Sequence, residues 1–207
     1  RSGHFTHYRM EDNNRQTLPS DIVRDIIPYK DLLIVATQNG VCLFDPDSGK
    51  CRQLFKDSKE GKSIKMVADI LLDSEGTLWI AATGEGVFNY RFDTRKLTNY
   101  RHDSANPNSL SNNNVNNIMQ DSQGHLWFST SGSGLDLYHP ANNDFENFDK
   151  EKNGLASDCV YETQESAASG KLLLITNQGF SIFDYQNMHI KNYSAENGFP
   201  LTAVNEN

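Results

Sequence analysis

The sequence predicts an all-β protein made of about four four-stranded antiparallel sheets, and three observations lead to this prediction. The stretch DSEGTLWIAATGEGVFNY at 73–90 recurs as DSQGHLWFSTSGSGLDLY at 121–138. A glycine and an aromatic residue each recur at intervals of about 46 residues. Within each interval, short apolar clusters alternate with Asp, Gly, Pro and Asn, which is typical of short strands joined by tight turns. Four strands in about 46 residues make one blade of a β-propeller, so we expect a propeller segment.

The two periodic markers are independent of each other. The glycine before the expected third strand of each blade falls at Gly40, Gly86, Gly134 and Gly179. The aromatic residue of the expected fourth strand falls at Tyr8, Phe55, Tyr100, Phe148 and Tyr193. Since both keep one period, we interpret residues 1–207 as a single propeller region.

The period divides the chain in order. Residues 1–17, with the alternating piece HFTHYR, are expected to hold the last strand of a preceding blade. Full blades are expected at 18–62, 63–107, 108–153 and 154–198, and the first strand of a further blade at 199–207. We expect these residues to belong to a larger, seven-bladed ring. Expressed alone, they must close as four blades or pair with a second copy, because an open blade face would expose an apolar patch.

The turn between the first two strands of a blade has its own signature, DSEG at Asp73 and DSQG at Asp121. The aspartate can accept hydrogen bonds from the backbone that follows, and glycine can take a positive φ at the last position. Asp45, Asp93 and Asp184 lie at other expected hairpins. Turn capping therefore explains these carboxylates without any catalytic role.

The expected second strands are apolar on both faces, as in LWIAA at 78–82. Such a sheet must be covered on both sides. Blades of a propeller cover one another in this way, so Trp79 and Trp127 are predicted to lie in the core between blades and not to act as sugar-stacking platforms. A parallel β-helix, with rungs about half this long, and an immunoglobulin-like array, with about 100 residues per repeat, fit less well.

Composition excludes several classes of protein. The formal charge of −8 argues against a nucleic-acid-binding surface, which would carry a basic stripe. No apolar run approaches the ~18 residues of a membrane span, so any membrane attachment would come from flanking segments.

The three cysteines show no CxxC spacing and indicate neither a disulfide framework nor a zinc site. A hairpin closing on DPDSGK would place Phe44 opposite Cys51 and Cys42 opposite Gln53. We therefore expect buried free thiols at Cys42 and Cys51.

The blade motif D-x-x-G-x-L-W-I-x-T-x-x-G-L resembles the two-component regulator propeller repeats. It is carried by the segments at Asp73 and Asp121, by the degenerate LLLITNQGFSIFD at Leu172, and by the strand starts LPSDIVRDI, LSNNNVNNI and LASDCVYET at Leu18, Leu110 and Leu155. The first and fourth blades depart from it, because Leu33 and Leu173 replace Trp and the Asp-x-x-Gly turn is missing.

The resemblance implies a role. Such repeats form the extracytoplasmic sensor region of hybrid two-component systems in polysaccharide-degrading bacteria, where two propellers precede a small β domain, a membrane helix and a histidine kinase. It implies a periplasmic homodimer that binds an oligosaccharide and signals across the membrane to control glycan-utilisation genes.

Catalysis has no candidate residues in this sequence. The six histidines are scattered, no catalytic motif is present, and we expect neither a metal nor a cofactor. Function on a rigid scaffold concentrates in loops. The loops from strand four to the next strand one, and from strand two to strand three, open on one face of a propeller.

Polar residues of these loops can bond sugar hydroxyls and are the candidate ligand-binding residues: Asn13, Arg15, Asn39, Glu85, His102, Asn106, Ser131, Ser133 and Asn177. Two alternatives to a glycan sensor stay open. One is a protein-interaction scaffold without a small ligand, and the other is a propeller polysaccharide lyase or hydrolase.

Overall fold

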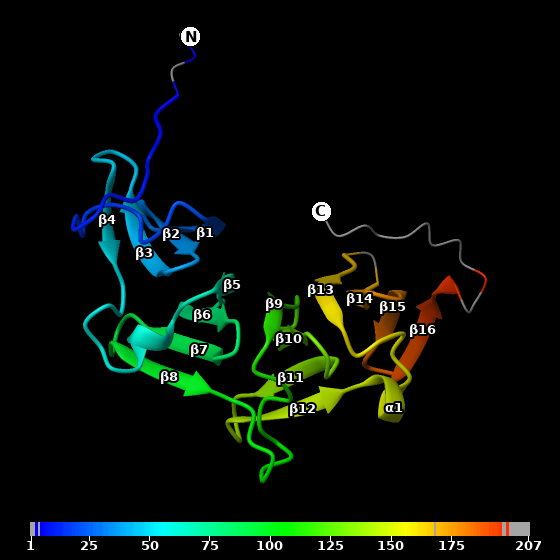
Figure 1. Cartoon of the computed structure of the whole chain (residues 1–207). Helices are drawn as coiled ribbons and strands as arrows, with labels where there is room; N and C mark the ends of the chain where they lie inside the picture. Colours follow the sequence, from blue (N-terminus) through cyan, green and yellow to red (C-terminus); the bar gives the residue numbers. More distant parts are fainter. Residues whose placement is uncertain (1–2, 4, 168, 196–197, 199–207) are drawn as a thin grey trace.

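A computed structural model describes residues 3, 5–167, 169–195 and 198, and it contains four four-stranded antiparallel sheets (Figure 1). The first sheet comprises β1 (Val23–Tyr29), β2 (Leu32–Thr37), β3 (Gly40–Asp45) and β4 (Lys50–Gln53). The second comprises β5 (Val67–Leu72), β6 (Thr77–Ala82), β7 (Gly86–Arg91) and β8 (Lys96–Tyr100). The third comprises β9 (Val115–Gln120), β10 (Leu126–Thr130), β11 (Leu135–His139) and β12 (Asp144–Phe148). The fourth comprises β13 (Val160–Glu165), β14 (Leu172–Thr176), β15 (Gly179–Asp184) and β16 (His189–Tyr193).

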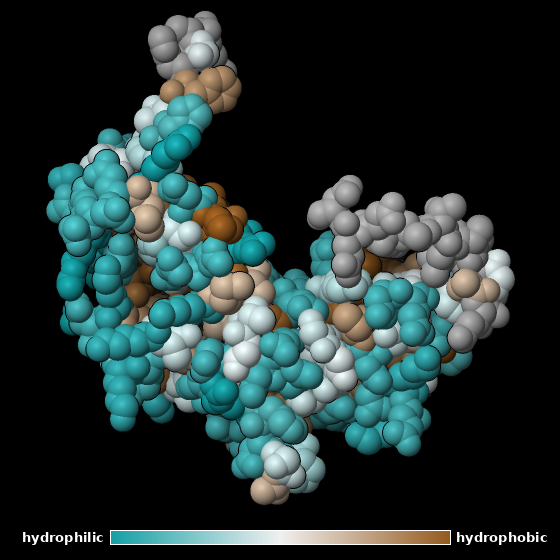
Figure 2. Space-filling view, in the orientation of Figure 1, coloured by the Kyte–Doolittle hydropathy of each residue, from teal (hydrophilic) through white to brown (hydrophobic). Residues whose placement is uncertain are grey.

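The sheets follow one another along an arc in chain order, and hydrophilic side chains cover most of the face seen in this orientation (Figure 2). In each sheet every strand pairs with the next in sequence. Figure 1 shows the first strands, β1, β5, β9 and β13, on the inner side of the arc and the fourth strands on its outer side. This arrangement confirms the predicted all-β fold of four-stranded blades.

Residues before β1 correct one expectation. None of residues 5–17 lies in a strand, although a fourth strand was expected there. The segment instead meets the edge of β4, where the Gln16 carbonyl accepts a hydrogen bond from the Cys51 N–H at 2.8 Å. A strand requires a paired neighbour over several residues, and this segment passes its neighbour at an isolated backbone contact. The first strand expected at 199–207 lies outside the described residues.

The recurrent aromatic residue marks the contact between successive blades. The aromatic of the third strand packs in each case against the aromatic that ends the preceding blade. The ring centroids are 4.8 Å apart for Tyr8–Phe44, 4.8 Å for Phe55–Tyr90, 5.6 Å for Tyr100–Tyr138 and 5.0 Å for Phe148–Phe183. Tyr8 thus takes the position expected of a fourth-strand aromatic without belonging to a strand.

Both tryptophans lie in the core between blades, as predicted. Trp79 is 2% exposed and Trp127 is 0% exposed. The Trp79 ring packs 5.5 Å from Phe128 of the third blade, and the Trp127 ring packs 5.2 Å from Tyr185 of the fourth. Each large ring therefore joins its own blade to the next.

The turn aspartates have a second role that the turn pattern alone does not show. Asp73 Oδ1 accepts hydrogen bonds from the backbone N–H groups of Glu75 and Thr77, which is the predicted capping. Its other oxygen accepts from the indole Nε1 of Trp79 at 2.8 Å. Asp121 accepts from Trp127 Nε1 in the same way at 3.0 Å. The aspartate thus satisfies a buried indole N–H that would otherwise lack a partner.

The register of the hairpin between β3 and β4 is the predicted one. Phe44 lies opposite Cys51, and Cys42 lies opposite Gln53. Both cysteines are buried and free, which confirms the expectation of thiols.

Two short helical turns in the blade-to-blade connections were not predicted. They are η1 (Gly61–Ser63) and α1 (Lys150–Asn153). The start of α1 is capped by the Asp149 carboxylate, which accepts from the Lys152 N–H at 2.6 Å, and Gly154 ends it at φ 81°. Asp before and Gly after a short polar run were signals of this turn. Among the described residues no helix is long and apolar enough to span a membrane.

Candidate ligand-binding face

Three loops meet at one end of each of the first three blades: the connection entering the blade, the turn between its second and third strands, and the connection leaving it. Backbone hydrogen bonds tie them together. In the third blade the N–H groups of Gly132 and Gly134 both donate to the Asp158 carbonyl, at 3.0 and 2.8 Å. In the second blade Gly84 and Gly86 bond Asn113 in the same way.

The recurrent glycine before the third strand lies close to the backbone of the fourth strand. Gly134 has φ 81°, and a Cβ there would lie 2.0 Å from the Phe148 carbonyl oxygen. A side chain would therefore clash with backbone as well as strain the glycine conformation. Gly86 and Gly179 approach a fourth-strand carbonyl in the same way, whereas at Gly40 the positive φ of 121° alone favours glycine.

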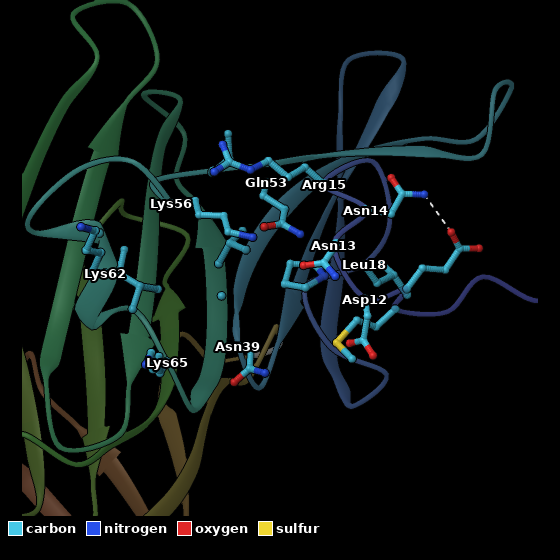
Figure 3. A pocket seen from close by; sticks show the side chains of 18 residues that line it. Asp12, Asn13, Asn14, Arg15, Leu18, Asn39, Gln53, Lys56, Lys62 and Lys65 are labelled. Atoms are coloured by element: carbon cyan, nitrogen blue, oxygen red, sulfur yellow. Dashed lines mark hydrogen bonds between the residues drawn. The ribbon is translucent and has the colours of Figure 1, made fainter.

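In the first blade these loops enclose a cavity of about 680 Å³ (Figure 3), which we call the first-blade pocket. Its lining comes from 10–19, 39–41 and 53–65. Three sequence-predicted candidates, Asn13, Arg15 and Asn39, are brought together there. Figure 3 shows Asn13 and Gln53 near the middle of the group of lining side chains and Asn39 below them.

The chemistry of the first-blade pocket is mixed. Amide groups come from Asn13, Asn14, Asn39 and Gln53, and apolar side chains from Leu18, Val41, Leu54 and Ile64. Charged groups come from Glu11, Asp12, Arg15, Lys56, Lys62 and Lys65. The three lysines were missed as candidates, although KDSKEGKSIK at 56–65 places four lysines in ten residues of an acidic chain.

Few of these polar groups are held by strong internal contacts. Asn14 Nδ2 donates to Glu11 Oε2 at 2.8 Å. Gln53 Nε2 lies 3.5 Å from the Thr17 carbonyl oxygen. Arg15 lies 3.5 Å from Asp57, and the Arg15 and Asp57 side chains are both exposed. Long contacts between exposed groups contribute little to stability. These side chains can therefore turn toward a ligand at small cost.

The equivalent loops of the third blade enclose a second cavity of about 380 Å³, the third-blade pocket. It brings together the candidates His102, Asn106 and Ser133. Its charged side chains are mostly acidic: Asp103, Asp149, Glu151 and Asp158, with Lys152. The His102 imidazole Nδ1 lies 3.0 Å from the Leu110 carbonyl oxygen.

A buried carboxylate lies beside the third-blade pocket. Asp136 is 0% exposed, and it accepts hydrogen bonds from Ser111 N and Oγ at 3.0 and 2.8 Å and from Asn147 Nδ2 at 3.0 Å. Burial raises the pKa of Asp136 to about 6, against the lowering effect of these bonds. Ser111 and Asn147 also line the pocket, so the carboxylate orders its wall.

The remaining candidates have partners of their own and line neither pocket. The Glu85 carboxylate pairs with Arg101. Ser131 Oγ donates to Asn116 Oδ1 at 2.8 Å, and Asn177 Oδ1 accepts from Ser157 at 2.7 Å. The structure therefore places the nine candidates in two separate pockets and at three other loop positions. Among the described residues, no group of three or more His, Cys, Asp or Glu side chains could hold a metal ion.

Comparisons with known proteins agree with this architecture. The family model "Two component regulator propeller" matches residues 109–132. The chain superimposes on the extracellular domain of a putative hybrid two component system from Bacteroides thetaiotaomicron with TM-score 0.76 and 23% identity, covering 90% of this chain and 26% of that one. A second such domain from the same organism gives TM-score 0.71 and 20% identity, covering 92% and 24%.

A more distant structural neighbour is an auxiliary nutrient binding protein from Bacteroides thetaiotaomicron, with TM-score 0.57 and 12% identity, covering 83% of this chain and 40% of that one. No curated protein matches the sequence. The chain spans about a quarter of the length of the two extracellular domains it matches. Residues 109–132 thus match the two component regulator propeller repeat, and the chain shares the blade fold of part of the extracellular domains of two putative hybrid two component systems.

Proposed function

We propose that this chain is part of the extracytoplasmic, periplasmic sensor region of a hybrid two-component histidine kinase. It binds an oligosaccharide on the loop face of the propeller. As a homodimer anchored by flanking segments, it passes the occupancy of the site across the inner membrane and so controls glycan-utilisation genes. The family match and the fold support the class of protein, and the loop face supports the site.

The first-blade pocket is the observation that carries the ligand assignment. A sugar presents hydroxyl groups around its ring and C–H groups on its faces. Asn13, Asn39 and Gln53 offer both donors and acceptors for hydroxyls, and Leu18 and Ile64 offer apolar surface. A cavity of about 680 Å³ lies within the range of small-ligand sites.

We assign this region a binding role and not a catalytic one. The structural neighbours are extracellular domains of putative hybrid two component systems and an auxiliary nutrient binding protein. The hairpin carboxylates for which turn capping was predicted do cap turns. Asp45, for example, accepts hydrogen bonds from Asp47 N and Ser48 Oγ. Their local contacts account for them.

The face of the fourth sheet that points away from the third sheet supports a ring with further blades. Leu173 and Ile182 occupy the positions that Trp127 and Leu137 occupy in the third sheet, where those residues are buried against the fourth. Ile175 on the same face is 38% exposed. A reconstruction of the full-length protein by electron cryomicroscopy in which this face stays in solvent would contradict the larger ring.

Calorimetry of the full-length protein against a panel of oligosaccharides tests the sensor role. We expect heat with at least one glycan, and weaker binding for Asn39→Ala and Asn13→Ala. Asn142→Ala, in an exposed turn between β11 and β12, is the matched control and should bind normally. Binding should also change the autophosphorylation of the histidine kinase and the cross-linking pattern of the dimer.

The alternatives predict different outcomes. A retained protein partner with no heat from any glycan would favour an interaction scaffold. Shortened glycan products after incubation with the purified protein would favour a lyase or hydrolase.

A further inference from the structure

We propose that the first-blade pocket selects an acidic oligosaccharide, one that carries carboxylate or sulfate groups, over a neutral one. This inference rests on the proposed sensor function and names the ligand class of the same site. It is carried by the charges of the pocket and by their arrangement.

The pocket is basic in an acidic chain. Four basic side chains line it, from Arg15, Lys56, Lys62 and Lys65, against two acidic ones, from Glu11 and Asp12. The whole chain carries a formal charge of −8. Like charges gathered in a concave site raise the local concentration of ligands of opposite sign. The pocket therefore attracts anions that the rest of the surface repels.

The three lysines and the two acidic side chains lie on different walls, while Arg15 belongs to the same segment as the acidic ones. Lys56, Lys62 and Lys65 belong to the connection that leaves the first blade, and Figure 3 shows them along one side of the pocket. Asp12 belongs to the segment entering the blade and lies on the opposite side. The amides of Asn13, Asn39 and Gln53 lie between. A sugar chain held by the amides would thus place an acidic substituent beside the lysines.

The three lysines are available for a ligand. Within the described ranges, no carboxylate lies within ion-pair distance of Lys56, Lys62 or Lys65. In the second and third blades, the corresponding loops pair a basic group with a carboxylate of the same blade. Arg101 pairs with Glu85 in the second blade, and Lys152 pairs with Asp149 at 3.0 Å beside the third-blade pocket. Lysine ammonium groups without a fixed partner can bond a carboxylate or sulfate oxygen directly.

The test is a calorimetric comparison of size-matched glycans with the full-length protein. The probes are tetragalacturonate, its fully methyl-esterified form, a sulfated tetrasaccharide prepared from heparin, and inorganic sulfate. The variant is Lys62→Glu with Lys65→Glu. Lys59→Glu is the matched control, because Lys59 lies in the same exposed connection but does not line the pocket.

We expect one of the two acidic oligosaccharides to bind at least tenfold more tightly than the esterified one, and more weakly as salt is added. The affinity of the double variant for the acidic oligosaccharide should fall about tenfold for each lysine replaced, which is the usual effect of losing a charge-assisted hydrogen bond. Lys59→Glu should change this affinity less than threefold.

Each other outcome overturns the inference in a recognisable way. Equal binding of charged and esterified glycans would refute the preference for acidic ligands and leave the sensor function standing. Equal losses in Lys59→Glu would assign the effect to general charge and not to the pocket. Competition by inorganic sulfate at the same concentration would replace the glycan with a free oxyanion. No binding of these oligosaccharides would refute the preference for acidic ligands, and no binding of any glycan of the wider panel would refute the sensor function itself.

Discussion

In the second and third blades a turn aspartate holds the indole of a buried tryptophan, whereas in the first and fourth blades leucine stands at the tryptophan position and the aspartate turn is absent. Asp73 bonds Trp79 and Asp121 bonds Trp127. Leu33 and Leu173 need no acceptor. The two changes occur together because a buried indole N–H without a partner is costly, and an aspartate without the indole loses one of its contacts.

The turns between the first two strands of the first and fourth blades (the outer blades) therefore differ from the aspartate turns of the second and third. In the first blade Lys30, with φ 55°, and Asp31 join Tyr29 and Leu32 directly, which form the last pair of the hairpin. In the fourth blade the loop runs from Ser166 to Lys171, whose backbones bond at 2.8 Å. Once the indole is gone, the turn can shorten or lengthen. The comparison teaches that the aspartate turn is retained for the core as well as for the hairpin.

Replacing the tryptophan should have the largest effect. We expect Trp127→Ala to lower the free energy of unfolding by about 3 to 5 kcal/mol, because it leaves a cavity between two blades. Leu173→Ala, at the equivalent but partly exposed position, should cost less. Urea unfolding measures both. Unchanged unfolding of Trp127→Ala together with lost glycan binding would show that the ring is a ligand platform.

The third and fourth blades also differ at a buried carboxylate, which makes the stability of the third blade depend on pH. Ser181 is the equivalent of Asp136 in the fourth blade, and its hydroxyl accepts from Ala156 N as Asp136 accepts from Ser111 N. Since the pKa of Asp136 rises from near 3.9 unfolded to about 6 folded, the folded state binds more protons between these values. Its contribution to stability is therefore full below pH 4 and is lost as pH rises through 6.

Asp136→Ser introduces the neutral residue found at the equivalent position of the fourth blade, and it should remove this pH dependence of stability. We expect its stability relative to the unmodified protein to improve by up to about 3 kcal/mol from pH 4 to pH 7. Urea unfolding at several pH values measures the difference. Asp69, whose pKa burial also raises to about 6, stays in both proteins and cancels. A difference that does not vary with pH would show that Asp136 stays ionised throughout.

Removing the aspartate while keeping the tryptophan should cost less than removing the ring. Asp121→Ala leaves the N–H groups of Gln123 and His125 and the indole of Trp127 without their acceptor. We expect a loss of about 2 kcal/mol in urea unfolding. In a Trp127→Leu background, which imitates the outer blades, the same change should cost about 1 kcal/mol less. Additive effects in this double-mutant cycle would contradict the coupling.

The smallest effect is expected at a loop ion pair. The Glu85 and Arg101 side chains are 39% and 46% exposed. Exposed pairs contribute little, so Glu85→Ala should change the unfolding free energy by no more than about 0.5 kcal/mol. A loss above 2 kcal/mol in urea unfolding would show that this pair is part of the scaffold of the second blade.

Periodicity was enough to predict the blades, and local turn chemistry was enough to predict the capping at Asp73 and the hairpin register at Cys51. These features depend on residues close together in the chain. The indole bond from Trp79 to Asp73 spans six residues and could have been suspected from the joint loss of both residues in the outer blades. The absence of a strand at residues 5–17 could not have been predicted from the sequence, because the alternating pattern is the same with or without a paired neighbour.

The fold class, the order of the blades and the positions of the core aromatics follow from the amino-acid sequence, because each repeat has the same local pattern of strands and turns. Which loop residues share a pocket became clear from the three-dimensional arrangement alone. Asn39 lines the same pocket as Lys62 in the first blade, while Glu85 pairs with Arg101 in the second. The reason is physical: the period places equivalent loops on one face, but the loop side chains themselves do not repeat, so their contacts depend on how neighbouring blades pack.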